Sequence, residues 1–504
     1  MIPAHAKSEA KKSGLAYWAS RVLEECDKAS NGFAADPVHD LRVAIRRCRS
    51  MADGFLSVDP DPAWKQMKRL AKPLFAALGD LRDTQVMLEW VAKLRELSDP
   101  LGDELLAALA AKEHHLKSAA QHALSDFDCK HWVALNGHLA NRTGNVPLEG
   151  LVFQHLALER WMDARELHRR ALRNRSGAAW HQLRIGIKRF RYTVENFLPQ
   201  RHEKWAKDLR ELQDALGEVH DFDVLRTLIS AHPVAHDAER SRWFHRIAEE
   251  RQRRLEVYRS KMVGRATLWD VWRAELPTGN VLEEAGIEKL RTWASLLDPD
   301  APHSRLVTEL ALTLFDGLSH CGILHPGLRD RLILEAAAYL HEVGRGKQLH
   351  RQPGGHQKRG QRTVAKLKPP IGWSAEDMQC LAALVRFHRG RLPARNEAAL
   401  AGLDRKRRTG LLRMMGVLRL ANALDESHRG SVSRLAITRE GNTVVVGVEG
   451  LRAMSQDAEH AARARYLLET VCRRPILIRM LRNRSRVKSL GPRVNTGRTQ
   501  PLNL

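Results

Sequence analysis

Apolar residues recur at intervals of three and four positions along almost the whole chain, and Ala, Leu, Arg and Glu are frequent between them. This spacing predicts a succession of amphipathic α-helices and therefore a mainly α fold. The helical pattern is interrupted at 277–280, where the sequence reads Pro-Thr-Gly-Asn. Because such residues end helices, we predict one helical region at 1–276, a linker at 277–280 and a second region from 281 onward.

The only segment with the pattern of strands is 435–450, in which two β-branched runs flank Glu-Gly-Asn at 440–442. It predicts a small β-hairpin within the second region. From Arg479 to the last residue the sequence contains Lys and Arg but no acid, together with Pro and Gly. We therefore predict a basic disordered tail at 479–504.

The first region contains an internal repeat. The segment VHDLRVAIRRCRSMADGFL (38–56) aligns without gaps with WHQLRIGIKRFRYTVENFL (180–198). A second pair follows, ALGDLRDTQVML (77–88) and ALGEVHDFDVLR (215–226), in which Gly79 matches Gly217 and Asp83 matches Asp221. Two copies of one helical unit are therefore present. The matched basic positions are His39 with His181, Arg42 with Arg184, Arg46 with Lys188, Arg47 with Arg189, and Arg49 with Arg191.

In each copy, four of these positions share one side of the predicted helix. On a helical wheel they fall within an arc of about 80°, opposite the apolar face, whereas Arg47 and Arg189 lie to one side. Cations three and four residues apart repel one another by a few tenths of a kcal/mol, and few acids interleave to relieve this. The stripes therefore favour an anion-binding site, with a solvated basic face as the alternative. The two stripes are His39, Arg42, Arg46 and Arg49, and His181, Arg184, Lys188 and Arg191.

Charge and length narrow the choice of anion. The chain of 504 residues has a formal net charge of +24, which favours a polyanionic partner. Each stripe is about 15 Å long and suits a flexible chain of phosphates, which Arg side chains bind in bidentate fashion. Tyr192 is the only aromatic near the stripes that could stack on a base. Duplex DNA bound through its backbone stays an alternative.

Other features bound the class of protein. The six cysteines lie far apart without a CxxC pair, which argues against a zinc ribbon or disulfide framework and fits a reducing cytoplasm. The N-terminal segment lacks the apolar stretch of a secretory signal, and nowhere do about 18 apolar residues follow one another. We therefore expect a cytoplasmic protein that does not span a membrane.

The two basic segments and the LG…D segments after them resemble the CHAD domain (conserved histidine α-helical domain), over about residues 1–276. This resemblance implies two pseudo-symmetric four-helix bundles whose basic helices face a central channel. It also implies binding of inorganic polyphosphate by those helices and, as in some members of the family, association with polyphosphate granules. The residues it implicates are His39, Arg42, Arg46, Arg47, Arg49, His181, Arg184, Lys188, Arg189 and Arg191.

Histidines and acids cluster in the second region, in AAAYLHEVGRG (336–346), GGHQKRGQRTV (354–364), LVRFHRGRLP (384–393) and LRLANALDESHRG (418–430). This series, which begins with the helix of 301–316, is similar to the HD-type helical domain at the C-terminus of exopolyphosphatase and guanosine pentaphosphatase. The resemblance covers about 281–478. It implies an all-helical domain with the small hairpin and a last helix and strand near 473–478.

Metal-dependent HD phosphohydrolases bind their ion through a His, an adjacent His-Asp pair and a distant Asp. The resemblance implies that the matching ligands, for Mg²⁺ or Mn²⁺, are His303, His341, Glu342 and Asp425, while His350 and His356 partly reproduce a further histidine cluster. The pair is His-Glu here, and the longer Glu displaces the carboxylate. The chain also contains no Gly-rich α/β segment like the actin-like region that carries catalysis in exopolyphosphatase.

We therefore expect a non-catalytic protein that binds inorganic polyphosphate in its basic channel and requires no cofactor. The second region would extend the binding surface through His388, Arg389, His428 and Arg429. One alternative is a metal-dependent phosphohydrolase that acts on polyphosphate or a nucleotide through the HD-like domain. A second alternative is a nucleic-acid-binding protein. The sequence indicates no protein partner.

Overall fold

The computed structural model describes residues 14–233, 236–346, 354–394 and 396–481. Its contacts divide the chain into two compact units. The N-terminal unit extends to Leu296 and includes Pro370–Gly372, and the C-terminal unit contains the rest from Leu297 onward. The predicted mainly α fold with a small β element is confirmed.

The N-terminal unit is entirely helical in the residues that are described. Its helices are α2 (Leu15–Ala29), α3 (Ala35–Phe55), α4 (Pro62–Leu70), α5 (Lys72–Leu94), α6 (Pro100–Ser125), α7 (Cys129–Thr143), α8 (Leu151–Asn174), α9 (Gly177–Phe197), α10 (Pro199–Ser230), α11 (Asp237–Met262), α12 (Leu268–Ala274) and α13 (Gly279–Ser295).

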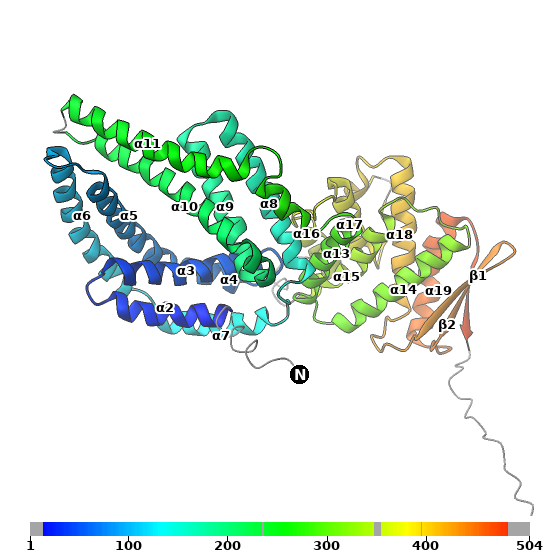
Figure 1. The fold of residues 1–504 in the computed structure, drawn as a ribbon. Coiled ribbons are helices and arrows are strands. Elements are labelled where there is room, and N and C mark those ends of the chain that lie inside the picture. Colours follow the sequence, from blue (N-terminus) through cyan, green and yellow to red (C-terminus); the bar gives the residue numbers. More distant parts are fainter. Residues whose placement is uncertain (1–13, 234–235, 347–353, 395, 482–504) are drawn as a thin grey trace, which may run out of the picture. The chain divides into compact units, whose positions relative to one another are not determined.

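The repeat in the sequence corresponds to two groups of helices. The first is built on α2, α3, α5 and α6 and the second on α8, α9, α10 and α11, with consecutive helices packed side by side in each (Figure 1). The predicted basic segments are α3 and α9, which also contact each other. In the first copy the chain forms two helices, α4 and α5, and Pro73 lies in the first turn of α5, since proline is not tolerated inside a helix. The second copy has no proline at the matching position, and α10 continues there as one helix.

The C-terminal ends of α3 and α9 meet through matched aromatic residues. Phe55 and Phe197 lie edge to face with ring centroids 5.4 Å apart, and Phe153 of α8 stacks on Phe197 at 4.2 Å. All three rings are buried. Gly54 packs so closely that a Cβ atom there would clash with the ring of Phe197. This contact holds the two basic helices together at one end.

Helix α13 belongs to the N-terminal unit by its contacts. It begins inside the segment that the sequence suggests as a linker, 277–280, and packs against α8. Lys289 Nζ of α13 lies 2.8 Å from Glu159 Oε1 of α8, and both side chains are buried. Through this ion pair and its packing on α8, α13 belongs to the N-terminal unit, and the division between the units falls after Leu296.

The C-terminal unit is mainly helical and carries a small sheet. Its helices are α14 (Ala301–His320), α15 (Asp330–Leu340), η1 (Val343–Arg345), α16 (His356–Val364), α17 (Ala375–Phe387), η3 (Ala398–Leu400), α18 (Arg405–Ala423) and α19 (Gln456–Cys472). Helices α14, α15, α17 and α18 contact one another and form its core.

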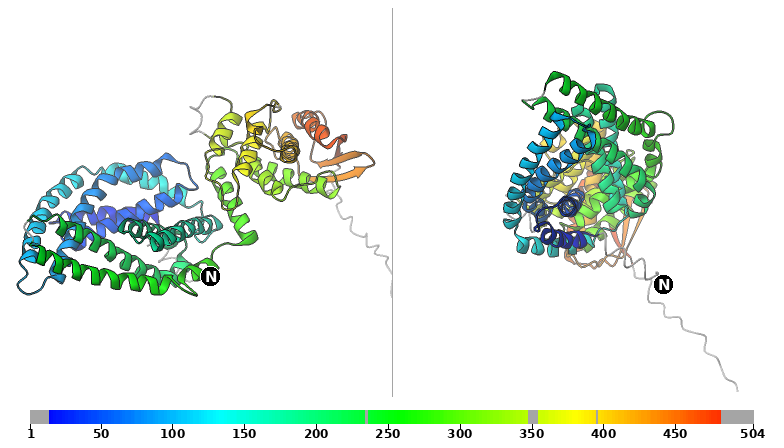
Figure 2. Two further views of the ribbon diagram at one scale, coloured as in Figure 1. Left: turned by 90° about the horizontal axis from the view of Figure 1, so that it is seen from above. Right: turned by 60° about the vertical axis from the view of Figure 1, so that its left-hand side comes forward.

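The predicted hairpin is present and gains a third strand. Strand β1 (Arg434–Glu440) pairs antiparallel with β2 (Thr443–Glu449), and β2 pairs in parallel with β3 (Ile476–Leu481) beside α19 (Figure 2). The first residues of the predicted tail, 479–481, therefore lie in a strand, where Arg479 forms an ion pair with Glu440. The rest of that tail, 482–504, lies outside the described residues.

The close approach of Gly54 to Phe197 leads to a first prediction. We expect Gly54→Ala to lower the free energy of unfolding of the N-terminal unit by about 1–3 kcal/mol, because the added methyl group overpacks the aromatic contact. Urea unfolding followed by Trp fluorescence measures this change. Gly137 of α7 has open space at its Cβ position, so the control Gly137→Ala should instead raise the free energy by about 0.5–1 kcal/mol. Equal effects of the two substitutions would contradict the role of this contact.

Candidate functional site

A basic cavity of about 740 Å³ lies between the repeated helices α3 and α9. Arg46 and Arg49 line it from α3, and Lys188 and Arg189 line it from α9. Lys68 of α4 and Arg160 of α8 add two further cations, and in the described lining Asp53 is the only carboxylate. Asp53 is itself in an ion pair with Lys68. The cavity thus collects positive charge from both copies of the repeat.

Aromatic rings and carbonyl oxygens hold the arginines of α3. The guanidinium groups of Arg42 and Arg49 each lie over the ring of Phe75, 5.0 Å from its centroid. Arg42 also donates to the carbonyl oxygen of Phe75 at 3.3 Å, and Arg49 donates to that of Lys68 at 3.0 Å. Arg46 lies over the ring of Tyr192 at 5.8 Å. Because these partners carry no formal charge, they orient the guanidinium groups without neutralising them.

The glycine of the LG…D motif makes room for one of these arginines. A Cβ atom at Gly79 would lie 2.8 Å from Nη1 of Arg42. At the matched Gly217 of the second copy no atom lies within 4 Å of that position. A larger residue than glycine at position 79 would therefore collide with the Arg42 side chain, whereas the structure shows no such contact at Gly217.

The basic groups of the site lie so close together that they lower one another's pKa values. Burial, together with the nearby charges of Arg46 and Arg184, lowers the pKa of Lys188 to about 7, although the carboxylate of Asp83 opposes this. Burial also lowers the pKa of Arg46, an effect that Arg47 and Arg191 increase. A bound anion would therefore relieve the repulsion between these basic groups and stabilise their charged forms.

Two predicted phosphate contacts are instead engaged in joining the helices. Arg47 pairs with Glu195 of α9, donates to Asn196 Oδ1 at 3.2 Å and lies over the ring of Trp18. Arg191 Nε lies 3.7 Å from Oε2 of the same Glu195. Both cations are thereby compensated by an acid, and neither lines the cavity. We interpret Arg47 and Arg191 as residues that hold α3 against α9.

The remaining predicted residues lie toward the other end of the helices. His39 is exposed, and burial of its ring together with Arg82 and Arg46 lowers its pKa. Nδ1 of His181 lies 3.2 Å from Nδ1 of His220 on α10. Burial raises the pKa of Asp221 to about 6, against the attraction of Arg184 and with help from Asp83. The matched acids Asp83 and Asp221 of the two copies therefore interact with each other.

Sequence reasoning missed several residues of the cavity lining, among them Lys68, Phe75, Arg160 and Thr193. Lys68 and Phe75 follow the first basic segment, and their position between the two repeated motifs is the only signal that could have indicated them. Thr193 lies beside the stripe of α9. Arg160 comes from α8, outside both motifs, and nothing in its local sequence distinguishes it from other surface arginines.

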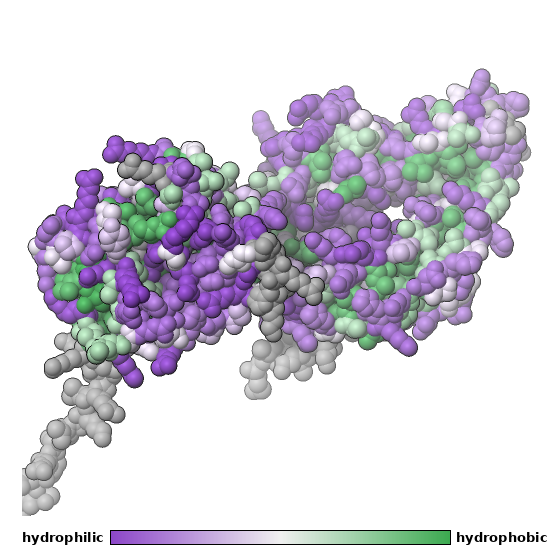
Figure 3. All heavy atoms as spheres, turned by 180° about the vertical axis from the view of Figure 1, so that it is seen from behind, coloured by the Kyte–Doolittle hydropathy of each residue, from purple (hydrophilic) through white to green (hydrophobic). Residues whose placement is uncertain are grey.

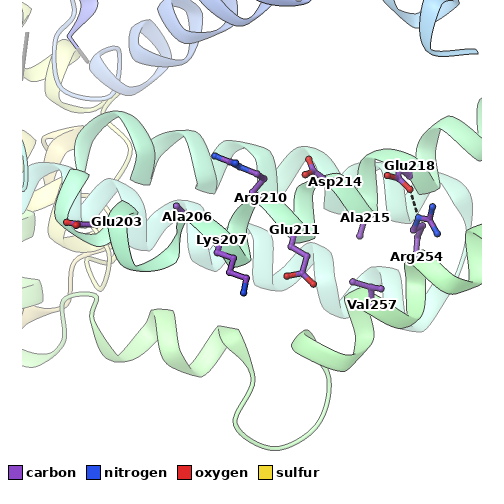
Figure 4. Close-up of a pocket in the computed structure, with 10 residues that line it drawn as sticks. All are labelled: Glu203, Ala206, Lys207, Arg210, Glu211, Asp214, Ala215, Glu218, Arg254 and Val257. Atoms are coloured by element: carbon purple, nitrogen blue, oxygen red, sulfur yellow. Dashed lines mark hydrogen bonds and ion pairs between the residues drawn. The ribbon is translucent and has the colours of Figure 1, made fainter. Parts of the chain in front are cut away.

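A second hollow of about 660 Å³ lies along α10 (Figure 4). It is lined by charges of both signs and serves as a comparison for the basic cavity. Four acids and three bases line it, and Arg254 is in an ion pair with Glu218. Arg210, Asp214 and Glu218 extend from one side of α10, and Lys207 and Glu211 from the other (Figure 4). With charges so evenly mixed, this hollow has no preference for an anion.

The C-terminal unit contains a group of five side chains that we call the His/Glu cluster. Its members are His303, His341, Glu342, His356 and His388. His303 lies in the first turn of α14, His341 and His388 directly follow α15 and α17, and His356 begins α16. Four of the five are buried, and the ligand atoms form two sets of three within 4.8 Å of one another, both containing Glu342.

The environment favours the neutral form of two of these histidines, His341 and His356. Burial and the neighbouring His388 lower the pKa of His341 to about 3, and burial lowers that of His356 to about 4. For His303, burial acts in the same direction but the hydrogen bond and charge of Asp425 outweigh it and raise the pKa. Neutral imidazoles and a carboxylate are ligands for a metal ion, so the cluster could hold one.

Three of the four predicted phosphate contacts of the C-terminal unit are buried or paired with acids in the structure. His388 is buried, with 1% of its surface exposed, and belongs to the His/Glu cluster. Arg389 is paired with Glu426 at 3.0 Å, and His428 with Asp300 at 2.7 Å. Of the four predicted residues Arg429 alone is exposed and has no described partner. His350 lies outside the described residues.

Two family models match the chain. Residues 16–230 match the CHAD domain, and residues 284–449 match Ppx/GppA phosphatase, domain III. The predicted order, a CHAD domain followed by a domain of the exopolyphosphatase type, is therefore confirmed. No curated protein matches the chain. Among the described residues no helix has the length and apolar character needed to cross a membrane, and hydrophilic side chains cover much of the face seen in Figure 3.

The lowered pKa of Lys188 predicts a pH-dependent stability. Below pH 7 the lysine is charged in both folded and unfolded chains, so the folded protein bears the full cost of burying that charge. Between pH 7 and the ordinary value of 10.5 the folded protein loses the proton first, and the cost disappears. Lys188→Met should therefore raise the melting temperature at pH 6 by at least about 2 °C and leave it unchanged near pH 10.5.

Differential scanning fluorimetry between pH 6 and pH 10 checks this expectation. The matched control is Lys130→Met, since Lys130 is an exposed lysine of α7 in the same unit. It should show no shift at any pH. A gain for Lys188→Met that grows with pH would show that the charge of Lys188 is stabilising, contrary to its surroundings in the cavity.

Proposed function

We propose that the protein binds inorganic polyphosphate without hydrolysing it, and that the basic cavity between α3 and α9 is the binding site. The observation that carries this proposal is the composition of the lining: six cations from four helices against one carboxylate, which is already paired with Lys68. A chain of phosphates would neutralise these cations over the length of the stripes. The match of residues 16–230 to the CHAD domain, a domain linked to polyphosphate, supports it.

The way the arginines are held favours a bare phosphate chain over a nucleic acid. A nucleic-acid site uses exposed aromatic faces for stacking on bases. Here Arg42 and Arg49 lie over the ring of Phe75, and Arg46 lies over that of Tyr192. These rings therefore serve to orient cations. Guanidinium groups that are already oriented lose less conformational entropy when they bind phosphate oxygens in bidentate fashion.

The binding surface that we propose is smaller than the sequence suggests. It comprises the six cations that line the cavity, Arg46, Arg49, Lys68, Arg160, Lys188 and Arg189. Arg42 and Arg184 extend it outside the lining, since their charges act on Lys188. Arg47 and Arg191 support it from outside, through Glu195. A cytoplasmic location, with recruitment to polyphosphate granules, follows as part of this proposal, since a protein that binds the polymer tightly would collect where the polymer does.

The test compares two double variants that remove the same number of charges. Arg46→Gln/Arg49→Gln removes two cations of the cavity, and Arg169→Gln/Arg170→Gln removes two exposed cations of α8. We expect the first to weaken polyphosphate binding at least tenfold, since each charge-assisted contact contributes about 1.5–3 kcal/mol. The second should change the affinity less than twofold. Fluorescence anisotropy with labelled polyphosphate across a salt series measures both.

Competition in the same assay separates the possible polyanions. Unlabelled polyphosphate should displace the probe at a lower concentration of phosphate units than duplex DNA does. Equal losses in the two double variants would mean that only net charge matters and would overturn the cavity as the site. Displacement by DNA at equal phosphate concentration would instead support the nucleic-acid-binding alternative.

A second candidate function, a metal-dependent phosphohydrolase, is favoured by one observation, the His/Glu cluster. A divalent ion bound there would activate water and polarise a phosphoryl oxygen. The test is phosphate release from polyphosphate and from nucleotides with Mn²⁺ present and after chelation. Release that requires the ion and falls at least 100-fold in Glu342→Gln would establish the hydrolase. If release is absent, the non-catalytic proposal stands. Release that persists unchanged in Glu342→Gln would contradict that proposal and would place the hydrolysis outside the His/Glu cluster.

A further inference from the structure

Ring nitrogens of two histidines, His356 and His388, face one carboxylate oxygen of Glu342. His388 Nδ1 lies 2.9 Å from the carbonyl oxygen of Val385, which can only accept, so Nδ1 carries the proton and Nε2 is an acceptor. That Nε2 faces Oε1 of Glu342 at 3.7 Å. His356 Nε2 faces the same oxygen at 3.6 Å. The potential ligand atoms of these three side chains therefore lie within 4.8 Å of one another.

Several of these atoms have no hydrogen bond in the part of the chain that the structure describes. Both carboxylate oxygens of Glu342, Nε2 of His356 and Nε2 of His388 are buried without a hydrogen-bond partner. Arg345, whose side chain is 37% exposed, forms an ion pair with Oε2 of Glu342, so Oε1 and the two histidine nitrogens are the acceptors without a charged partner of this kind. Buried acceptors left without a donor cost free energy, and a cation among them would remove that cost.

The residues that the HD-type resemblance implies as ligands differ in this respect. His303 Nδ1 donates to Asp425 Oδ2 at 2.8 Å, and its Nε2 lies 3.3 Å from Asn422 Oδ1. The second oxygen of Asp425 accepts from the backbone N–H of Gly430 at 2.8 Å. Each polar side-chain atom of His303 and Asp425 thus has a hydrogen-bond partner among the described residues, and Nε2 of His303 also lies 3.3 Å from Nε2 of His341.

We propose that the C-terminal unit binds one divalent transition-metal ion through Glu342, His356 and His388, and that His303 and Asp425 are not its ligands. Two imidazoles and one carboxylate form a three-ligand set that leaves a coordination position open, as in many zinc sites. Because two of the three donors are nitrogen, Zn²⁺, Co²⁺ or Mn²⁺ should be preferred over Mg²⁺, which takes oxygen ligands. The site is independent of the polyphosphate cavity, which lies in the other unit.

Metal binding is tested on the full chain after chelation, with the ions themselves as probes. Elemental analysis after Zn²⁺ loading and desalting should give one ion per chain, and Co²⁺ should produce visible absorption bands of a nitrogen- and oxygen-ligated site. Mg²⁺ in large excess should not displace Co²⁺. Absence of bound Zn²⁺ and Co²⁺ in the wild-type chain would overturn the proposal.

Variants then distinguish the two sets of ligands. His388→Ala and His356→Ala should each weaken Co²⁺ binding at least 100-fold, whereas His303→Gln and Asp425→Asn should retain one ion with less than a tenfold change. His320→Ala, at the exposed end of α14, is the matched control and should bind like the wild type. Far-UV circular dichroism establishes that each variant is folded. Loss of the ion in folded His303→Gln or Asp425→Asn, with retention in His388→Ala, would restore the family's ligand set and overturn ours.

The proposed ligands can also be tested without the ion. Because Glu342, His356 and His388 leave buried acceptors unsatisfied in the metal-free chain, His388→Leu should raise the melting temperature of the chelated protein. Asp425→Leu should lower it, since it breaks a satisfied network. The opposite order of these two shifts would contradict the assignment.

Discussion

The N-terminal unit depends on holding two helices together although both carry cations toward the same space. Helices α3 and α9 are matched copies, and Arg46 and Lys188 occupy equivalent positions close enough for each to disfavour the other's charge. Three contacts oppose this repulsion: the packing of Phe55 on Phe197, the ion pair of Arg47 with Glu195, and the hydrogen bond between Ser50 and Asn196. The cavity persists because these contacts lie to its side, so that the basic groups stay apart from acids that would neutralise them.

Duplication produced two helices of similar sequence, yet matched residues have different roles. Arg47 is compensated by Glu195, whereas its counterpart Arg189 is exposed and lines the cavity. The counterpart of Glu195 is Asp53, which pairs with Lys68 of α4. Tyr192, in the position of Ser50, carries an arginine on its ring. One side of the α3–α9 contact is therefore closed by ion pairs and the other is open to an anion, an asymmetry that a repeat in the sequence does not reveal.

Periodicity and the repeat were sufficient to predict the helices, the hairpin and the basic faces of α3 and α9, because these follow from local spacing. What local spacing cannot show is which acid from elsewhere reaches a given cation. Arg47 therefore looked like a phosphate contact, and Arg160 of α8 went unnoticed. In the C-terminal unit His388 and Glu342 are separated by more than forty positions in sequence, and only the fold brings them together. Similarly, the ion pair of Lys289 with Glu159 assigns α13 to the N-terminal unit despite the turn before it.

The protonation state of Lys188 has a consequence for any polyanion that enters the cavity. With a pKa of about 7, this lysine is mostly neutral in an alkaline solution, and phosphate beside it would favour its charged form. Binding above pH 7 then takes up a proton from the solvent, and by linkage a falling proton concentration weakens binding. A polyanion bound in the proposed site would therefore be coupled to a proton, and alkaline solution would promote its release.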